Sequence, residues 1–131
     1  MDEFAYLPVS KTLEDFPDLP LEMTRSENVQ VAFIQAETED EGDRLAYVET
    51  KLVKNLKWVA KKNNASKVIL HSFAHLSESK ADPHITKQLF DQVQARMQTA
   101  GYDVSQTPFG YFLNLDIQAP GNSLARVFKS F

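Results

Sequence analysis

The sequence predicts a single α/β domain in which short strands alternate with two helices. Several short segments are apolar and rich in β-branched or aromatic residues, whereas two longer stretches repeat their apolar residues every three or four positions. The length of 131 residues suits one domain, and 43% hydrophobic with 24% charged residues is ordinary for a globular protein. The expected order is β-β-α-β-α-β-β in one or two layers.

The first third of the chain holds two predicted strands joined by a long connection. Phe4–Val9 is a short apolar segment, and Pro8 favours an edge strand or a strand end there. Residues 10–28 are polar with two further prolines, so we expect a loop. Val29–Glu37 combines β-branched and aromatic residues with partial alternation, which predicts a strand.

Two helices are predicted from the spacing of apolar residues. In Asp43–Asn63 the apolar positions fall on one helical stripe: Leu45, Val48, Leu52, Leu56 and Val59. Asp82 and Pro83 form a good helix start, a capping acid followed by proline at the first helical position. Apolar residues then recur every four positions from Ile85 to Met97, and Gly101 supplies the end.

The remaining segments complete the expected sheet. Lys67–Leu70 is almost wholly apolar, which is typical of a central strand. Tyr102–Val104 and Tyr111–Gln118 are the last two predicted strands, and residues 123–131 are expected to close the chain as a short helix.

Charge is distributed unevenly along the chain. Residues 1–43 carry 12 acidic and 2 basic side chains, and residues 44–131 carry 6 acidic and 12 basic ones. This asymmetry fits a surface that meets a polyanion, or simply loops and helix faces of different charge. The first predicted helix has a basic outer face that could contact RNA phosphates, or could only be solvated, formed by Lys51, Lys54, Lys57, Lys61 and Lys62.

The composition also excludes several classes of protein. The chain has no cysteine, so disulfides, thiol nucleophiles and thiolate metal sites are absent, as suits a reducing compartment. No apolar stretch approaches the roughly 20 residues that cross a bilayer, and the acidic N-terminus does not resemble a signal peptide. We expect a cytoplasmic protein that is not associated with a membrane.

The three histidines cluster between the strand 67–70 and the second helix. His71 and His75 are four residues apart, but this spacing makes a metal-ligand pair only on a helix, so we expect no metal and no cofactor. The neighbouring serines lack the Gly-x-Ser-x-Gly elbow of a nucleophile, and no glycine-rich phosphate loop exists. His71, at the end of a buried strand, is expected to be structural, and His84 to be exposed in the first helical turn.

Two loops that follow apolar segments remain as a candidate binding site, Ser72–Ser77 and Thr107–Phe112. Small residues such as Ala74 and Gly110 expose main-chain groups that can bind a polar ligand. His75 would be the titratable group at the rim, with apolar walls from Phe73, Phe109, Tyr111 and Phe112. Alternatively, His75 caps a strand end and the aromatic residues belong to the core.

Four segments resemble a known family. They are "VAFIQAE", "FAHLS" followed eight residues after His75 by Pro83, "GYDVSQTPFGYF" and "GNSLA". They are similar to the N-terminal editing domain of archaeal threonyl-tRNA synthetases, whose fold resembles that of the D-aminoacyl-tRNA deacylases. The resemblance covers residues 29–126 of a single domain, 1–131, and leaves residues 1–28 as a divergent strand and loop.

The resemblance implies an enzyme that deacylates mischarged seryl-tRNA(Thr), or a D-aminoacyl-tRNA, at the ester of the terminal adenosine. It implies His75 and Tyr111 as catalytic residues. It also implies a substrate pocket formed by Ala36, Ser72, Phe73, Ala74, Phe109, Gly110 and Phe112. The implied partners are aminoacylated tRNA, a second copy in a homodimer, and a threonyl-tRNA synthetase served in trans.

Two departures from the family pattern leave the activity open. Leu113 stands where the family has a lysine that helps to position water, and Arg126 stands where it has a glutamate. Catalysis could rest on main-chain groups and the substrate's own hydroxyl, as the resemblance to D-aminoacyl-tRNA deacylases implies. Alternatively, the chain is an inactive relative that binds tRNA 3′ ends or a small amino-acid-like ligand.

Overall fold

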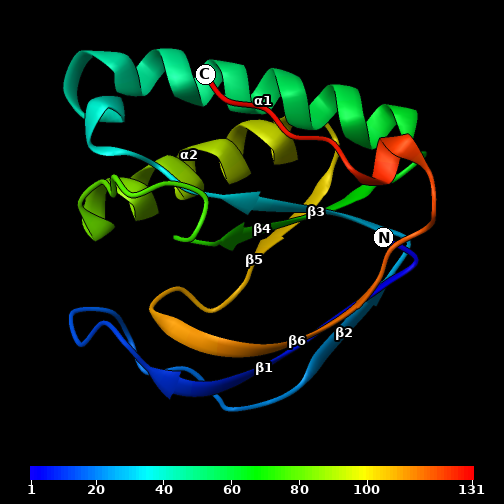
Figure 1. The fold of residues 1–131 in the computed structure, drawn as a ribbon, viewed down its shortest axis with the longest axis horizontal. Coiled ribbons are helices and arrows are strands. Elements are labelled where there is room, and N and C mark those ends of the chain that lie inside the picture. The colour runs from blue at the N-terminus through cyan, green and yellow to red at the C-terminus, as the bar shows by residue number, and fades with distance from the viewer.

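Two three-stranded sheets and a pair of helices form three layers (Figure 1). The computed structural model describes all residues, 1–131. The elements are β1 (Glu3–Lys11), β2 (Thr24–Glu27), β3 (Val29–Ile34), α1 (Leu45–Lys62), β4 (Lys67–Ser72), α2 (Pro83–Thr99), β5 (Asp103–Gln106) and β6 (Tyr111–Gln118). Neither helix has the length and hydrophobicity needed to cross a membrane. The mixed α/β class is as predicted, but the two separate sheets give three layers instead of the one or two expected.

The middle layer is a parallel sheet with the strand order β3-β4-β5. Its central strand β4 buries Val68, Ile69 and Leu70 almost completely, because the helices cover one face and the second sheet covers the other. This two-sided burial explains why the segment is nearly all apolar and confirms its predicted central position.

The outer layer is an antiparallel sheet with the order β2-β1-β6, and it corrects two expectations. β2 lies inside the predicted loop 10–28, and β1 is a middle strand rather than an edge. Pro8 is accommodated because β2 pairs with β1 only as far as Tyr6, and because the register with β6 shifts between Pro8 and Ser10.

The helices begin close to their predicted positions. The Asp82 carboxylate accepts a hydrogen bond from the His84 N–H at 2.8 Å, which caps α2 ahead of Pro83. The expected C-terminal helix is wrong, however. Only Ser123–Ala125 form a 3-10 turn, and residues 126–131 run extended along α1 (Figure 1). Phe131 packs against the core beneath this segment, so apolar contact rather than helical hydrogen bonding holds it.

Two hydrophobic cores lie between the three layers. Thirteen buried residues, among them Leu70, Phe90 and Met97, fill the space between the helices and the parallel sheet. A second core between the sheets contains Phe4, Tyr6, Val29, Val31 and Ile69. Full burial of one such side chain stabilises the fold by about 1.5–3 kcal/mol. The two cores fix the layers and leave the loops at the ends of the strands to form a site.

Candidate functional site

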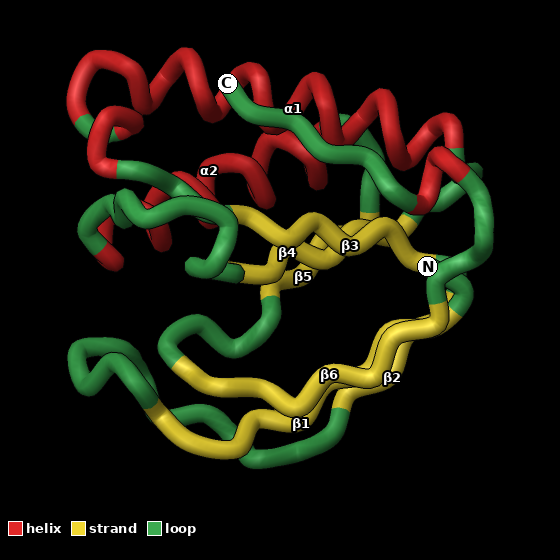
Figure 2. Tube along the Cα trace, in the orientation of Figure 1, coloured by secondary structure: helices red, strands yellow, loops and turns green.

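The candidate site lies where the strands of the parallel sheet end. The loops that follow β4 and β5 emerge at the same end of the molecule, beside the long loop that follows β1 (Figure 2). In α/β folds this end of the strands is where ligands usually bind. The topology therefore brings together the two loops that the sequence singled out, 72–77 and 107–112.

Gln35, which directly follows β3, holds the loop that carries His75. Its Oε1 accepts hydrogen bonds from the N–H groups of Leu76 and Ser77 at 2.6 and 2.7 Å. Its Nε2 donates to the carbonyls of Ser77 and Ser79 at 2.9 and 2.8 Å. One amide side chain thus satisfies four main-chain groups. Sequence reasoning missed this residue, and the only available signal was a polar side chain directly after an apolar strand.

The serines of the same loop also have structural partners. The Ser77 hydroxyl donates to the Glu37 carboxylate. The Ser79 hydroxyl accepts from the Thr38 N–H at 3.0 Å, and the Ala36 carbonyl accepts from the Ala81 N–H at 3.0 Å. These contacts attach the loop to the segment after β3, and they give both serine hydroxyls a role in loop structure.

His71 is buried in β4 and joins this strand to the loop after β5. Its Nδ1 lies 2.9 Å from the Thr107 hydroxyl oxygen, and the Thr107 N–H donates to the Leu70 carbonyl at 3.0 Å. Burial lowers the pKa of His71 from 6.5 to about 4, so the ring is neutral at pH 7. This geometry gives His71 the structural role expected from the sequence.

His75 stands at the exposed end of a row of aromatic rings. Phe33 lies 5.0 Å from His71 and 5.3 Å from Phe73, and Phe73 lies 5.0 Å from His75, all measured between ring centroids. Phe73 and Ala74 are partly buried, and so is Ser72 at the end of β4, whereas His75 is exposed. The row places the His75 ring against Phe73 at a position exposed to solvent.

The loop after β5 is covered by the N-terminal connection. Phe109 is buried against Phe16 and Phe90, with ring centroids 4.9 and 6.1 Å away. Gly110 has a φ of +84°, and its carbonyl accepts hydrogen bonds from the N–H groups of Thr12 and Leu13 at 2.6 and 3.3 Å. The Gly110 carbonyl is therefore engaged within the protein.

The residues that open β6 point in different directions. The Tyr111 hydroxyl accepts a hydrogen bond from the Leu19 N–H at 2.8 Å. Phe112 is 63% exposed, and Leu113 packs against the core between the two sheets. Because successive side chains of a strand face opposite sides, Phe112 lies on the other face of β6 from its two neighbours. The structure thus separates Phe112 from Phe109.

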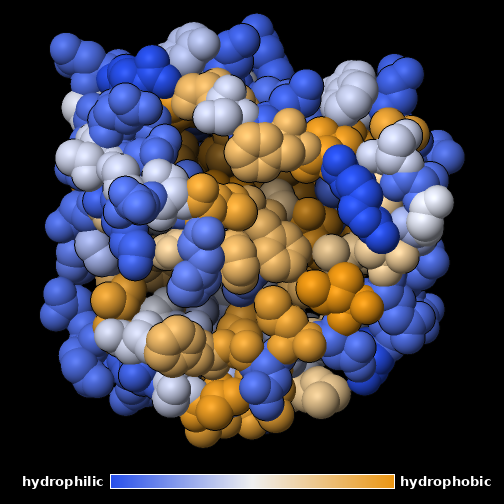
Figure 3. Space-filling model, in the orientation of Figure 1, coloured by the Kyte–Doolittle hydropathy of each residue, from blue (hydrophilic) through white to orange (hydrophobic).

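Two cavities flank these loops. One of 550 Å³ lies between β3, α1 and the C-terminal segment, and its lining includes Ala36, Asp40 and Ser77. The other, of 370 Å³, lies between the 16–24 connection and the residues around Phe109. Neither cavity is lined by Ala74, His75 or Gly110. Figure 3 shows hydrophobic side chains gathered around the hollowed centre of the face that carries β3.

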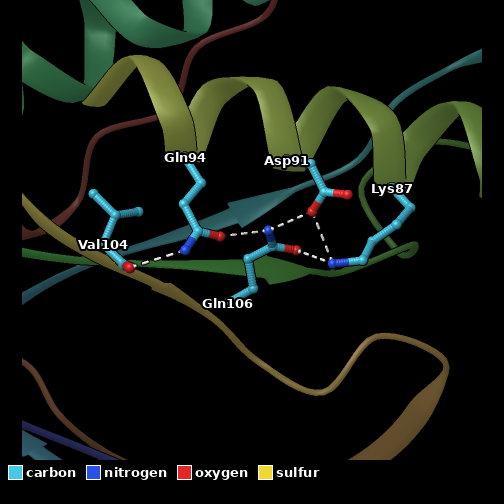
Figure 4. A network of polar contacts seen from close by, with 5 residues as sticks. All are labelled: Lys87, Asp91, Gln94, Val104 and Gln106. Atoms are coloured by element: carbon cyan, nitrogen blue, oxygen red, sulfur yellow. Dashed lines mark hydrogen bonds and ion pairs between the residues drawn. The ribbon is translucent and has the colours of Figure 1, made fainter. Parts of the chain in front are cut away.

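A polar network fixes the end of β5 to α2 (Figure 4). The Gln106 amide nitrogen donates to the side chains of Asp91 and Gln94 at 2.9 and 2.6 Å, and its oxygen accepts from Lys87 at 2.9 Å. Burial raises the pKa of Asp91, but hydrogen bonds from Gln106 and Lys87 and the Lys87 charge outweigh it, so the pKa is lowered. The network positions the strand directly before Thr107.

The predicted basic face is exposed on α1. Four of its lysines lie on the solvent side of the helix and form no ion pair: Lys51, Lys54, Lys57 and Lys61. Arg126, at the position of the family glutamate, donates to the Pro120 carbonyl at 3.1 Å.

The fold and the paired loops define an α/β domain with a candidate site at the ends of its parallel strands. The family model described as the archaea-specific editing domain of threonyl-tRNA synthetase matches residues 1–131, so the chain belongs to this family. The match confirms the resemblance and includes residues 1–28. Membership supports a role in aminoacyl-tRNA editing, and hence in translation.

Similar proteins include threonine–tRNA ligases of archaea. Those of Thermococcus onnurineus and Pyrococcus horikoshii are each 33% identical over 106 residues, covering 81% of this chain and 17% of the relative. That of Methanosphaera stadtmanae is 28% identical over 131 residues, covering 98% of this chain and 21% of the relative. The chain spans about a fifth of the length of the curated relatives it matches.

Proposed function

We propose that the chain is an editing deacylase that hydrolyses the ester of seryl-tRNA(Thr) at the terminal adenosine. The observation that carries the proposal is the match of the entire chain to the synthetase editing domain. The loop that Gln35 holds supports it, because this loop presents main-chain groups around Ala74 and an accessible His75.

The need for such a reaction follows from the likeness of serine and threonine. An apolar pocket distinguishes substrates that differ by one methyl group by only about 1–3 kcal/mol. A second, smaller site that excludes the methyl group of threonine would hydrolyse only the tRNA that was wrongly charged with serine. Small residues such as Ala74, together with a rigid main chain, suit a pocket of this kind, because a fixed backbone discriminates by size.

In the proposed mechanism the substrate itself supplies part of the chemistry. Main-chain groups of Ala74 and His75 hold the serine, and the neighbouring ribose hydroxyl orients a water molecule toward the ester carbonyl. His75, at the rim, accepts a proton from this water as its oxygen bonds to the ester carbonyl carbon, and returns it to the ribose oxygen that leaves when the ester bond breaks. Neutral His71 holds Thr107 in place instead of acting as the base. Leu113 packs against the core between the sheets, so this position supplies no polar group to the reaction.

A second candidate function is binding without turnover, to a tRNA 3′ end or an amino-acid-like ligand. The observations that favour it are the hydrocarbon at position 113 and the engagement of the Gly110 carbonyl within the protein. A D-aminoacyl-tRNA is the other substrate of the same chemical class.

The deciding experiment measures deacylation of seryl-tRNA(Thr), threonyl-tRNA(Thr) and a D-aminoacyl-tRNA. Wild type is compared with His75→Ala and with His84→Ala, a control at an exposed histidine that stacks on Phe16. We expect rapid loss of serine alone, slowed roughly 10²- to 10⁴-fold by His75→Ala and unchanged by His84→Ala. Rates equal to buffer on all three substrates would reject the enzyme and leave the binding function.

The proposal includes the partners that the family resemblance implies. The chain acts on the acceptor end of tRNA, pairs through its sheets as a homodimer, and serves a threonyl-tRNA synthetase in trans. Analytical ultracentrifugation of the chain tests the dimer, and a monomer at all concentrations used in the deacylation assay would refute it.

A further inference from the structure

One outer face of α1 combines two aromatic side chains with three lysines. Tyr47, Lys51, Lys54, Trp58 and Lys61 follow one another in steps of four, three, four and three residues, which places them on a single helical stripe. This outer stripe lies opposite the buried residues of α1. All five side chains are exposed, including 49% of Tyr47 and 44% of Trp58.

The outer stripe carries positive charge without an acidic partner. Its three lysines form no ion pair, and Glu49, the one acidic residue of α1, is bound by Arg96 from α2 at 3.0 Å. Cations instead lie over the aromatic rings. The Lys51 Nζ is 5.8 Å from the Tyr47 centroid, and Lys129 of the C-terminal segment places its Nζ 5.7 Å from the Trp58 centroid.

We propose that the outer stripe binds unpaired nucleotides of RNA, with bases stacked on Tyr47 and Trp58 and phosphates contacted by the intervening lysines. Proteins that hold single-stranded RNA combine these two elements, because every base has a flat face and every linkage is an anion. The proposal rests on the proposed function, in which the substrate is a tRNA. It adds a second binding surface, on α1, that contacts the RNA of the substrate, whereas the site at the strand ends contacts the ester.

The spacing of the two aromatic residues limits which bases they take. Eleven residues of helix separate them by about 16 Å, far more than the roughly 3.4 Å between neighbouring stacked bases. The two rings therefore accept bases from different positions of a loop or an irregular strand. A regular duplex offers only phosphates to this surface, because its bases are already stacked.

Other partners fit the outer stripe less well. A membrane-surface helix turns an apolar face to the lipid, but the apolar face of α1 is buried against the sheet. An acidic protein would use the lysines and leave two large aromatic side chains exposed without a role. RNA uses all five residues of the stripe.

Trp58 is the only tryptophan of the chain, so its fluorescence reports directly on the outer stripe. The full chain is titrated with a single-stranded RNA oligonucleotide, a blunt RNA duplex with the same number of phosphates, uncharged tRNA and polyglutamate. We expect quenching by the single strand and by tRNA, and little quenching by the duplex. Trp58→Ala should weaken binding of labelled single-stranded RNA about tenfold, and Trp58→Phe should restore most of it.

Salt dependence tests the lysines separately from the aromatic rings. Each of Lys51→Gln, Lys54→Gln and Lys61→Gln should reduce the slope of log affinity against log salt by about 0.7. Lys11→Gln is the matched control, because this lysine lies in the opposite layer and already pairs with Asp18. A slope that changes equally in all four variants would overturn the proposal. So would equal affinity for duplex and single strand, or polyglutamate binding as tight as RNA.

Two assays on the wild-type protein distinguish this proposal from the proposed function. Hydrolysis of 3′-seryl adenosine by wild type requires the site at the strand ends but no RNA body. If this ester and seryl-tRNA(Thr) are both stable while RNA quenches Trp58, the deacylase is rejected and the outer stripe stands. If the ester is cleaved while no RNA quenches Trp58, the outer stripe is rejected and the deacylase stands.

Discussion

The His71 Nδ1 lies 2.9 Å from the Thr107 hydroxyl oxygen, inside the protein. This contact joins the central strand of the parallel sheet to the loop that follows its neighbour, so the two loops of the candidate site share one anchor. The imidazole is neutral at pH 7, because burial lowers its pKa to about 4. The geometry of the candidate site therefore depends on a buried, neutral histidine.

Stability should fall as the pH falls from 6.5 toward 4. The unfolded chain binds a proton at His71 near pH 6.5, but the folded chain does so only near pH 4, so protonation favours unfolding within this window. We expect the free energy of unfolding to drop by about 2 kcal/mol between pH 7.5 and pH 5 because of this group. Urea unfolding of wild type and His71→Gln at both values measures the difference. An equal pH dependence in the two proteins would contradict the assignment.

Replacing Gln35 should loosen the loop of His75. Gln35→Leu removes the partners of four main-chain groups, and each unsatisfied group costs about 1–3 kcal/mol unless water reaches it. We expect faster amide exchange at Leu76 and Ser77 and at least a tenfold lower deacylation rate. Hydrogen exchange followed by NMR makes the first measurement without relying on activity.

The matched variant Gln35→Glu keeps the oxygen that accepts from Leu76 and Ser77 but loses the two donors. It should protect these two amides more than Gln35→Leu does. If both variants exchange at the wild-type rate, the side chain of Gln35 does not hold the loop.

The sequence predicted the elements whose signals are local and missed those that depend on tertiary contacts. The bounds of β6 agree with the prediction, and the Asp82 cap marks the true start of α2. β2 was missed because Thr24–Glu27 is polar and buries only Ser26, so its strand conformation comes from pairing with β1. No local pattern distinguishes it from a loop.

The candidate site shows the same division. The two loops were found from small residues and aromatic residues that follow strands. The packing of Phe16 against Phe109 could not be predicted from the sequence, because the two residues are far apart in sequence and share no motif. The role of Gln35 depends equally on a contact across more than forty residues.

Introducing the family lysine at position 113 should destabilise the chain. Leu113 packs against the core between the sheets, where a charged group loses its hydration. We expect Leu113→Lys to lower the free energy of unfolding by about 1–3 kcal/mol, and Leu113→Met to change it by less than about 1.5 kcal/mol. Burial would lower the pKa of the new lysine, so the loss should grow as the pH falls. Deacylation by Leu113→Lys above the wild-type rate would contradict the inward position of this side chain.

Substitutions at three glycines distinguish the cost of backbone strain from the cost of steric contact. Gly110 has a φ of +84°, and a Cβ built there would lie 3.1 Å from the Leu13 Cβ, whereas Gly101 has a φ of +97° in open space. Gly121 has neither constraint. We expect Gly101→Ala to cost about 1 kcal/mol, Gly110→Ala to cost more, and Gly121→Ala to change the free energy of unfolding by less than about 0.5 kcal/mol.

The same series tests whether the loop after β1 supports the site. Gly110→Ala should displace Leu13 and weaken the hydrogen bonds that Thr12 and Leu13 donate to the Gly110 carbonyl. Amide exchange at these two residues should therefore accelerate in Gly110→Ala and stay unchanged in Gly101→Ala. Equal urea midpoints for these two variants would show that the contact with Leu13 adds nothing, and that the positive φ accounts for the glycine at both positions.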